Sequence, residues 1–385
     1  MKRRWNLRIL FIVLLLAGLA VREIVMESGP TFLRPDLHLF AYVGNTADGT
    51  ASAIDLVKLA TVATIPVGPS PSGVRAHPKR EEIWGVSSEG GYAWVLDARH
   101  GQVLSRIPVG AGPFAVEFSP DARRAFVAAS GAGYVTAIDC ETKKVLGRGH
   151  AGRRPWIARA APDGKLLVVS NRDDATVSLL DANTLNSLAT ISVAQHPEQI
   201  AILPDSSKAF ISSGSSNMIS VVDLHAHTLL ANVDLGGGPS GLVLKPDGGE
   251  LYVPSPEVHG LVILNTQTNE VAEFLLLGLA PSQAVLTADA SMLYVSDSAA
   301  GLVIAVNISN RQVVTTVSVG QNPGAMVLPQ DEDIILVVDQ DSNDLAVLRA
   351  RTILQQAGGA TAPPSSLITL IPVGRKPRDI AIKSF

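Results

Sequence analysis

Prolines recur along most of this chain at one fixed distance. Seven of them stand 42 residues apart, and an eighth follows the seventh after 54 residues. They are Pro71, Pro113, Pro155, Pro197, Pro239, Pro281, Pro323 and Pro377. A period of about 40 to 45 residues is the length of one four-stranded β-propeller blade. The sequence therefore predicts an all-β, eight-bladed propeller, with seven blades as the alternative count.

Two further columns of residues repeat with the same period. One is an aromatic or branched apolar residue early in a strand: Tyr42, Trp84, Phe126, Val168, Phe210, Tyr252, Tyr294 and Leu336. The other ends a strand, and its acidic members include Asp97, Asp139, Asp181 and Asp223. An aspartate after a strand accepts hydrogen bonds from the backbone that follows it. We therefore interpret these acids as turn caps and not as catalytic groups.

The two ends of the chain indicate how the ring closes. In the third unit we expect strands at residues 156–160, 166–170, 176–180 and 187–193. Three strands between residues 41 and 67 precede the first inner strand, and one inner strand at residues 378–383 ends the chain. If these strands pair, they complete a blade and leave no exposed sheet edge. The extra residues of the last repeat, near residues 355–366, are interpreted as a loop insertion.

Charge and cysteine content narrow the possible partners. The chain has 31 Lys plus Arg, 35 Asp plus Glu and a net charge of −4, which argues against nucleic acid as a partner. The single Cys140 allows no internal disulfide, and we expect it to be a small buried residue. We assign residues 37–385 to one propeller domain because the strict repeat outweighs the length.

The start of the chain differs from the rest. Basic residues precede an uncharged apolar run at residues 9–21, which is shorter than the roughly 20 residues that span a bilayer. Residues 1–30 are therefore predicted to be a signal peptide, with an uncleaved membrane anchor as the alternative. Both interpretations place the propeller outside the cytoplasm, in the periplasm or secreted.

One face of the ring carries the candidate binding residues. The loop before each repeating proline and the loop between the second and third strands should emerge on the same face, where a rigid frame supports them. The candidates on that face are Arg153, Arg154, Trp156, Arg172, His196, Glu198, Arg375, Lys376 and Arg378. Guanidinium groups beside an aromatic ring favour an anionic ligand, which could be a small molecule, a glycan or a protein. The alternative is a solvated rim whose charges bind nothing.

Histidines and acidic loops give weaker signals for a metal or a cofactor. Only His196 stands in a column that faces the ring centre, and a lone histidine is more often a polar rim residue. His77 precedes Pro78 on the opposite face, so we expect it at the surface. Residues 339–344 imitate the start of a calcium loop but lack its Gly and its final Glu. No metal site, catalytic residue or cofactor is predicted.

Several short segments resemble the YVTN-repeat propellers. These segments are Tyr42-Val43-Gly44-Asn45, Ala53-Ile54-Asp55, Ile65-Pro66-Val67-Gly68 and Gly320-Gln321-Asn322-Pro323. The resemblance covers residues 37–385 and implies an exported propeller that acts as a binding or protein-interaction scaffold. It also leaves two enzymatic alternatives: a haem-binding domain similar to the propeller of periplasmic nitrite reductases, and a lactonase-like hydrolase.

Overall fold

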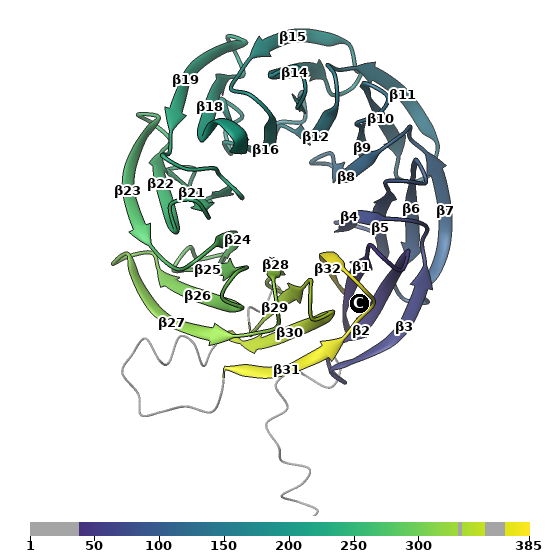
Figure 1. Ribbon diagram of the computed structural model, residues 1–385. Coiled ribbons are helices and arrows are strands. Elements are labelled where there is room, and N and C mark those ends of the chain that lie inside the picture. The colour runs from purple at the N-terminus through teal and green to yellow at the C-terminus, as the bar shows by residue number, and fades with distance from the viewer. Residues whose placement is uncertain (1–37, 330–332, 351–365) are drawn as a thin grey trace, which may run out of the picture. The chain divides into compact units, whose positions relative to one another are not determined.

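Most of the repeating prolines begin the innermost strand of a sheet. The computed structural model describes residues 38–329, 333–350 and 366–385. Residues 39–385 form one unit, in which eight four-stranded antiparallel sheets are arranged as the blades of a ring (Figure 1). The eight-bladed prediction is therefore confirmed. The predicted leader, residues 1–30, lies outside the described residues, as does nearly all of the predicted insertion.

We name the sheets blades A to H and give the strands of each from the innermost outwards. Blade A contains β32 (Pro377–Ser384), β1 (Leu39–Asn45), β2 (Thr50–Asp55) and β3 (Ala60–Pro66). Blade B contains β4 (Pro71–Ala76), β5 (Glu82–Ser87), β6 (Tyr92–Asp97) and β7 (Gln102–Pro108). Blade C contains β8 (Pro113–Phe118), β9 (Arg124–Ala129), β10 (Tyr134–Asp139) and β11 (Val145–His150). Blade D contains β12 (Pro155–Ala160), β13 (Leu166–Asn171), β14 (Thr176–Asp181) and β15 (Ser187–Ser192).

The remaining four blades repeat the same order. Blade E contains β16 (Pro197–Ile202), β17 (Lys208–Ser213), β18 (Met218–Asp223) and β19 (Thr228–Asp234). Blade F contains β20 (Val243–Leu244), β21 (Glu250–Ser255), β22 (Gly260–Asn265) and β23 (Glu270–Leu276). Blade G contains β24 (Pro281–Leu286), β25 (Met292–Asp297), β26 (Leu302–Asn307) and β27 (Gln312–Ser318). Blade H contains β28 (Pro323–Val327), β29 (Ile334–Asp339), β30 (Asp344–Arg349) and β31 (Leu367–Pro372).

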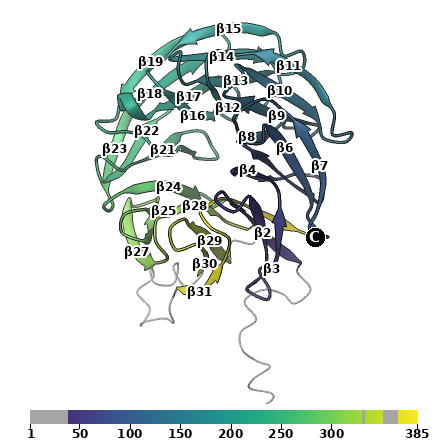
Figure 2. The same cartoon turned by 45° about the vertical axis from the view of Figure 1, so that its right-hand side comes forward.

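Blade A joins the two ends of the chain, as the unpaired strands predicted. The last strand, β32, pairs antiparallel with β1, with Tyr42 opposite Ala381 and Phe40 opposite Lys383. Figure 1 shows β32 between β28 and β1, and in Figure 2 the yellow end of the chain lies beside the purple strands β2 and β3. Closure satisfies backbone groups that would otherwise remain unpaired at an edge. The inner side of blade A therefore exists only in the closed ring.

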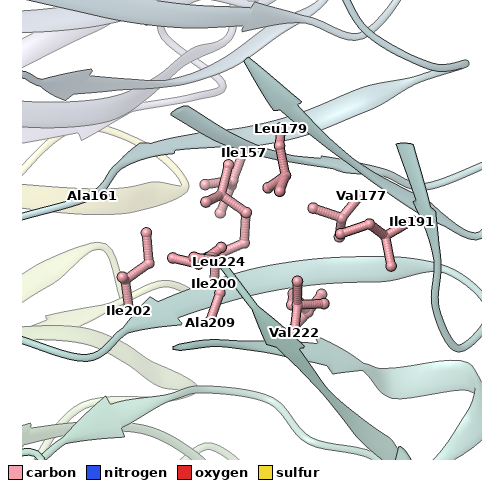
Figure 3. Close-up of a cluster of buried hydrophobic side chains, with 12 residues drawn as sticks. Ile157, Ala161, Val177, Leu179, Ile191, Ile200, Ile202, Ala209, Val222 and Leu224 are labelled. Carbon is pink, nitrogen blue, oxygen red and sulfur yellow. The ribbon is translucent and has the colours of Figure 1, made fainter. Parts of the chain in front are cut away.

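The core consists of apolar layers between neighbouring blades. Figure 3 shows one such cluster, in which Ile157 and Leu179 of blade D face Ile200 and Val222 of blade E. Because both faces of the second and third strands are covered, those strands are almost continuously apolar and buried. The outer strands do not follow this pattern, since exposed and half-buried residues alternate along β3. Successive side chains of a strand point to opposite faces of the sheet, so along β3 the better-buried side chains alternate with exposed ones.

Blade F departs from the predicted scheme at its inner strand. β20 has only two residues, whereas the inner strands of the other blades have five to eight. The second strand of this blade contains Pro254. Its carbonyl accepts a hydrogen bond from the Ser240 N–H at 3.0 Å, but a proline has no N–H that could donate a hydrogen bond back to the inner strand. In blade E the corresponding residue, Ser212, accepts the Gln199 N–H at 2.9 Å through its hydroxyl. The proline therefore shortens the ladder at this point.

Candidate functional site

Two kinds of loop meet on one face of the ring, as predicted. The Arg172 N–H, after the second strand of blade D, donates to the Arg154 carbonyl at 3.1 Å. The Gln340 N–H donates in the same way to the Asn322 carbonyl at 3.1 Å. We call this side of the ring the proline face. The opposite face carries the predicted turn caps; for example, Asp97 accepts the N–H of the second and third residues after it at 2.8 and 2.9 Å.

The residue before the proline holds the backbone in an unusual conformation in most blades. It has a positive φ at Ser70 (49°), Gly112 (64°), Arg154 (53°), His196 (54°), Asn322 (54°) and Lys376 (52°). Residues other than glycine adopt this left-handed region rarely. Three of the predicted site residues therefore owe their position on the rim to a backbone turn that most of the blades share.

A stack of side chains crosses the proline face near the ring centre. The rings of Phe114 and Trp156 lie 3.9 Å apart between centroids, with 24° between their planes. The Arg378 guanidinium lies over the Phe114 ring at 5.1 Å from its centroid, and the Arg172 guanidinium lies over the Trp156 ring at 4.9 Å. Glu198 closes the series with an ion pair to Arg172 at 2.7 Å. The stack joins blades A, C, D and E, so four of the predicted residues belong to one assembly.

A central pocket of about 300 Å³ lies beside this stack. The inner strands supply most of its lining: Ser72, Gly73, Arg75, Phe114, Ala115, Glu117, Ile157, Ala158, Arg159, Gln199, Gln283, Gly324, Ala325, Arg378 and Asp379. Gln340 reaches the pocket from the loop after β29. Its volume is at the lower end of the range for small-molecule sites.

The charges in the pocket are mostly paired. Arg75 and Asp379 form an ion pair at 3.0 Å between blades B and A, and the Asp379 carboxylate raises the pKa of the Arg75 guanidinium. Arg159 and Glu117 pair more loosely at 3.7 Å between blades D and C. These contacts lie between side chains distant in sequence, so the ring, and not a local motif, assembles the charged wall.

The pocket residues share a position that the sequence analysis did not use. The residue two places after each leading proline lines the pocket in seven blades: Gly73, Ala115, Ile157, Gln199, Gln283, Ala325 and Asp379. The residue before the proline, from which three of the candidate residues were chosen, lies on the rim instead. This inner column mixes glycine, alanine, glutamine and aspartate. That variation is the feature of the sequence from which the lining of the pocket could have been predicted.

The remaining predicted residues lie outside the central pocket and carry partners of their own. Arg153 and Arg154 line a separate groove of about 450 Å³ beside blade D, where they pair with Asp174 and Asp173. Arg375 pairs with Asp48 at 2.7 Å on the rim. Lys376 pairs with Asp341 at 2.8 Å and lines a groove of about 680 Å³ between blades A and B. These basic groups form neutralised rim contacts and not one cationic patch.

Two histidines do not lie where the sequence placed them. His196 is exposed on the rim of the proline face and is not part of the pocket lining, so its column does not face the ring centre. The prediction that His77 lies at the surface is wrong, since this residue is only 1% exposed. His77 accepts the Lys79 and Arg80 N–H groups and packs against Phe118 at 4.9 Å. Burial lowers the pKa of His77.

The acidic, histidine and cysteine side chains were compared with what a metal site needs. In the described ranges, no three His, Cys, Asp or Glu residues gather closely enough to hold a metal ion. The segment that imitates a calcium loop is the β29 to β30 hairpin, in which Asp339 and Asp344 are direct neighbours across the strands. Cys140 is buried as predicted.

Within residues 38–329, 333–350 and 366–385, no helix has the length and apolar character to span a membrane.

Comparisons with known proteins define the fold class. The sequence matches no protein-family model and no curated protein. Among solved structures, hydrazine synthase of Kuenenia stuttgartiensis aligns over 70% of this chain and 89% of its own, with a TM-score of 0.59 and 20% identity. Dihydro-heme d1 dehydrogenase NirN in complex with DHE aligns over 92% of this chain and 76% of its own, with a TM-score of 0.74 and 17% identity. At this identity the likeness concerns the fold alone: the chain is an eight-bladed β-propeller.

Proposed function

We propose that this protein is an exported, YVTN-type propeller that binds an anionic ligand at the centre of its proline face without catalysing a reaction. The observation that carries this proposal is the stack of Arg378, Phe114, Trp156 and Arg172 beside the central pocket. Such a stack fixes guanidinium groups that would otherwise sample many conformations, and a pre-organised cation binds an anion at a smaller entropic cost. Export rests on the basic and apolar start of the sequence.

The residues of the site suit the binding of an anion better than the catalysis of a reaction. Arginine presents donors in a fixed planar fork that suits carboxylate and phosphate oxygens. The carboxylates in the pocket are held by arginines, as in the Arg75 to Asp379 pair, so they serve to position those cations.

Melting curves of the full-length chain in the presence of anions test the proposal. The panel contains N-acetyl-trialanine, citrate, glucuronate and polygalacturonate. At least one should raise the melting temperature saturably, since a ligand at one hundred times its Kd adds about 2.7 kcal/mol of stability. The double variant Arg172→Ala with Arg378→Ala should lose this response. Arg123→Ala, on the opposite face, is the control and should keep it. A wild-type chain that responds to no anion would refute the proposal.

A haem-related ligand is the second candidate, because one structurally similar protein is a dihydro-heme d1 dehydrogenase in complex with DHE. The residues present do not fit an iron-ligating haem, since the described lining of the pocket contains no His, Met or Cys. Titration of the full-length chain with haem separates the two candidates. A saturable shift of the haem absorption band at equimolar ratio would favour the second, and an unchanged spectrum would favour the first.

A further inference from the structure

The charges around the pocket leave one cation without a counter-charge. Arg75, Arg159 and Arg172 each have a carboxylate partner, at 3.0, 3.7 and 2.7 Å. Arg378 also lines the pocket and is exposed, but within the described residues its side chain has no hydrogen bond or ion pair, and its ring contact is with Phe114. One monovalent anion therefore balances the site, and Arg378 is the group that would receive it.

Three amide side chains also line the pocket. Gln199, Gln283 and Gln340 reach it from blades E, G and H. The Gln283 Nε2 donates to the Ser240 carbonyl at 3.0 Å, which leaves its side-chain oxygen as an acceptor for a ligand N–H. Each glutamine amide can both donate and accept, and a peptide bond needs one partner of each kind.

The aromatic rings argue against a sugar as the occupant. A sugar ring binds to aromatic residues through an open ring face. Here Phe114 and Trp156 are stacked on one another, and the guanidinium groups of Arg378 and Arg172 lie over the same two rings. Small apolar side chains, among them Ile157, complete the lining and suit short aliphatic groups.

We propose that the pocket captures the carboxyl terminus of a peptide, with the terminal carboxylate on Arg378 and the last peptide bonds against the glutamines. This inference rests on the proposed anion-binding function and names the class of ligand. The volume of about 300 Å³ corresponds to about ten water molecules, which suits two or three small residues. Capture of a chain terminus is a recurring mode of peptide recognition.

Phe114 is a positioning residue in this arrangement. Its ring lies under the Arg378 guanidinium at 5.1 Å, a contact of the cation–π type. Without the ring, Arg378 keeps its charge but loses its fixed orientation. Phe114→Leu should therefore weaken binding several-fold, and Phe114→Tyr, which keeps the ring, should restore it.

Calorimetric titration of the full-length chain with two matched peptides tests the inference. The peptides are N-acetyl-trialanine with a free carboxyl terminus and the same peptide ending in an amide. The acid should bind at least tenfold more tightly than the amide. Arg378→Gln should remove that difference, Arg378→Lys should keep part of it because a lysine offers charge without the planar fork, and Arg154→Gln, in the separate groove, should leave it unchanged. A melting temperature within a few degrees of wild type confirms that each variant is folded.

The outcomes separate the ligand class from the binding function. Equal affinity for the acid and the amide, or an unchanged preference in Arg378→Gln, overturns the peptide terminus as the ligand. If the acid peptide fails but glucuronate binds and is lost in Arg378→Gln, the ligand class is wrong and the anion-binding function stands. If no anion binds the wild-type protein, the anion-binding function and the peptide terminus as its ligand are both refuted. A small carrier protein that ends in the same three residues shows whether the ligand is the end of a protein or a free peptide. Binding of the carrier supports the carboxyl terminus of a protein. Binding of the free peptide alone supports a short peptide.

Discussion

A buried aspartate and a half-buried neighbour in blade H make the stability of the propeller depend on pH. Asp339 ends β29 and lies directly opposite Asp344 at the start of β30. Asp339 is fully buried, and burial together with the hydrogen bond to Asp344 raises its pKa to about 8. At neutral pH the native state therefore keeps a proton that the unfolded chain has released.

The size of this effect follows from proton linkage. A native state that holds one proton more than the unfolded state loses about 1.4 kcal/mol of stability per pH unit as the pH rises. The loss begins near the ordinary pKa of an aspartate, about 4, and ends near 8, above which Asp339 is ionised in both states. Asp339→Asn imitates the protonated acid, since its amide can accept from the Gly320 N–H, now 2.9 Å from the carboxylate, and donate to Asp344. We expect the variant to match wild type near pH 4 and to be more stable by several kcal/mol at pH 8.

Blade G provides the matched control. Asp297 occupies the same place in its blade but lies opposite Leu302, and its carboxylate accepts four backbone N–H groups at 2.6 to 3.2 Å. Asp297→Asn should therefore destabilise the protein at pH 7, by about 1 to 3 kcal/mol. Urea unfolding followed by tryptophan fluorescence between pH 4 and 9 gives both values. Parallel pH profiles for wild type and Asp339→Asn would refute the shared proton.

Two further predictions concern the pocket wall and the opposite face. Gly73 has a φ of 59°, and an added Cβ would lie 2.5 Å from the Ala115 Cα, whereas Gly164 has a φ of 72° and nothing within 4 Å. Gly164→Ala should cost about 1 kcal/mol through its φ alone, and Gly73→Ala at least twice as much; equal losses in urea unfolding would contradict this. Because burial lowers the pKa of His77, its contribution to stability is complete above about pH 6.5 and is lost as the pH falls through the lower native pKa. His77→Ala should cost about 1 to 3 kcal/mol at pH 7 and less at pH 5, and a constant difference between these pH values would contradict a buried neutral histidine.

The repeat predicted the blades well because each blade is built from contacts close in sequence. The predicted strands of the third unit agree with β12 to β15 to within one residue at each end. Closure was predictable too, since both chain ends carried strands without partners. The short β20 was not predicted, because its cause is one missing N–H at Pro254, a residue of the next strand.

The site was predictable only in part, and the reason is distance along the chain. Trp156 and Arg172 lie in one unit and Glu198 lies in the next, and the repeat placed them on one face. The partner of Arg75 is Asp379, at the other end of the sequence, and the ring under Arg378 is Phe114, two blades away. His77 was placed wrongly because a turn residue beside a proline is usually exposed, whereas its contacts with Ala122 and Phe118 of the next blade depend on how the blades pack.

Ring closure and ligand binding depend on the same strand. β32 pairs with β1 through backbone hydrogen bonds, and its residues Arg378 and Asp379 supply the unpaired cation and the partner of Arg75. If β32 separated from β1, the pocket would lose both groups at once. A ligand on Arg378 therefore stabilises the closed state relative to any state in which β32 is detached, by an amount that grows with ligand concentration. β32 therefore both completes the fold and carries the arginine through which a bound ligand would stabilise the closed ring.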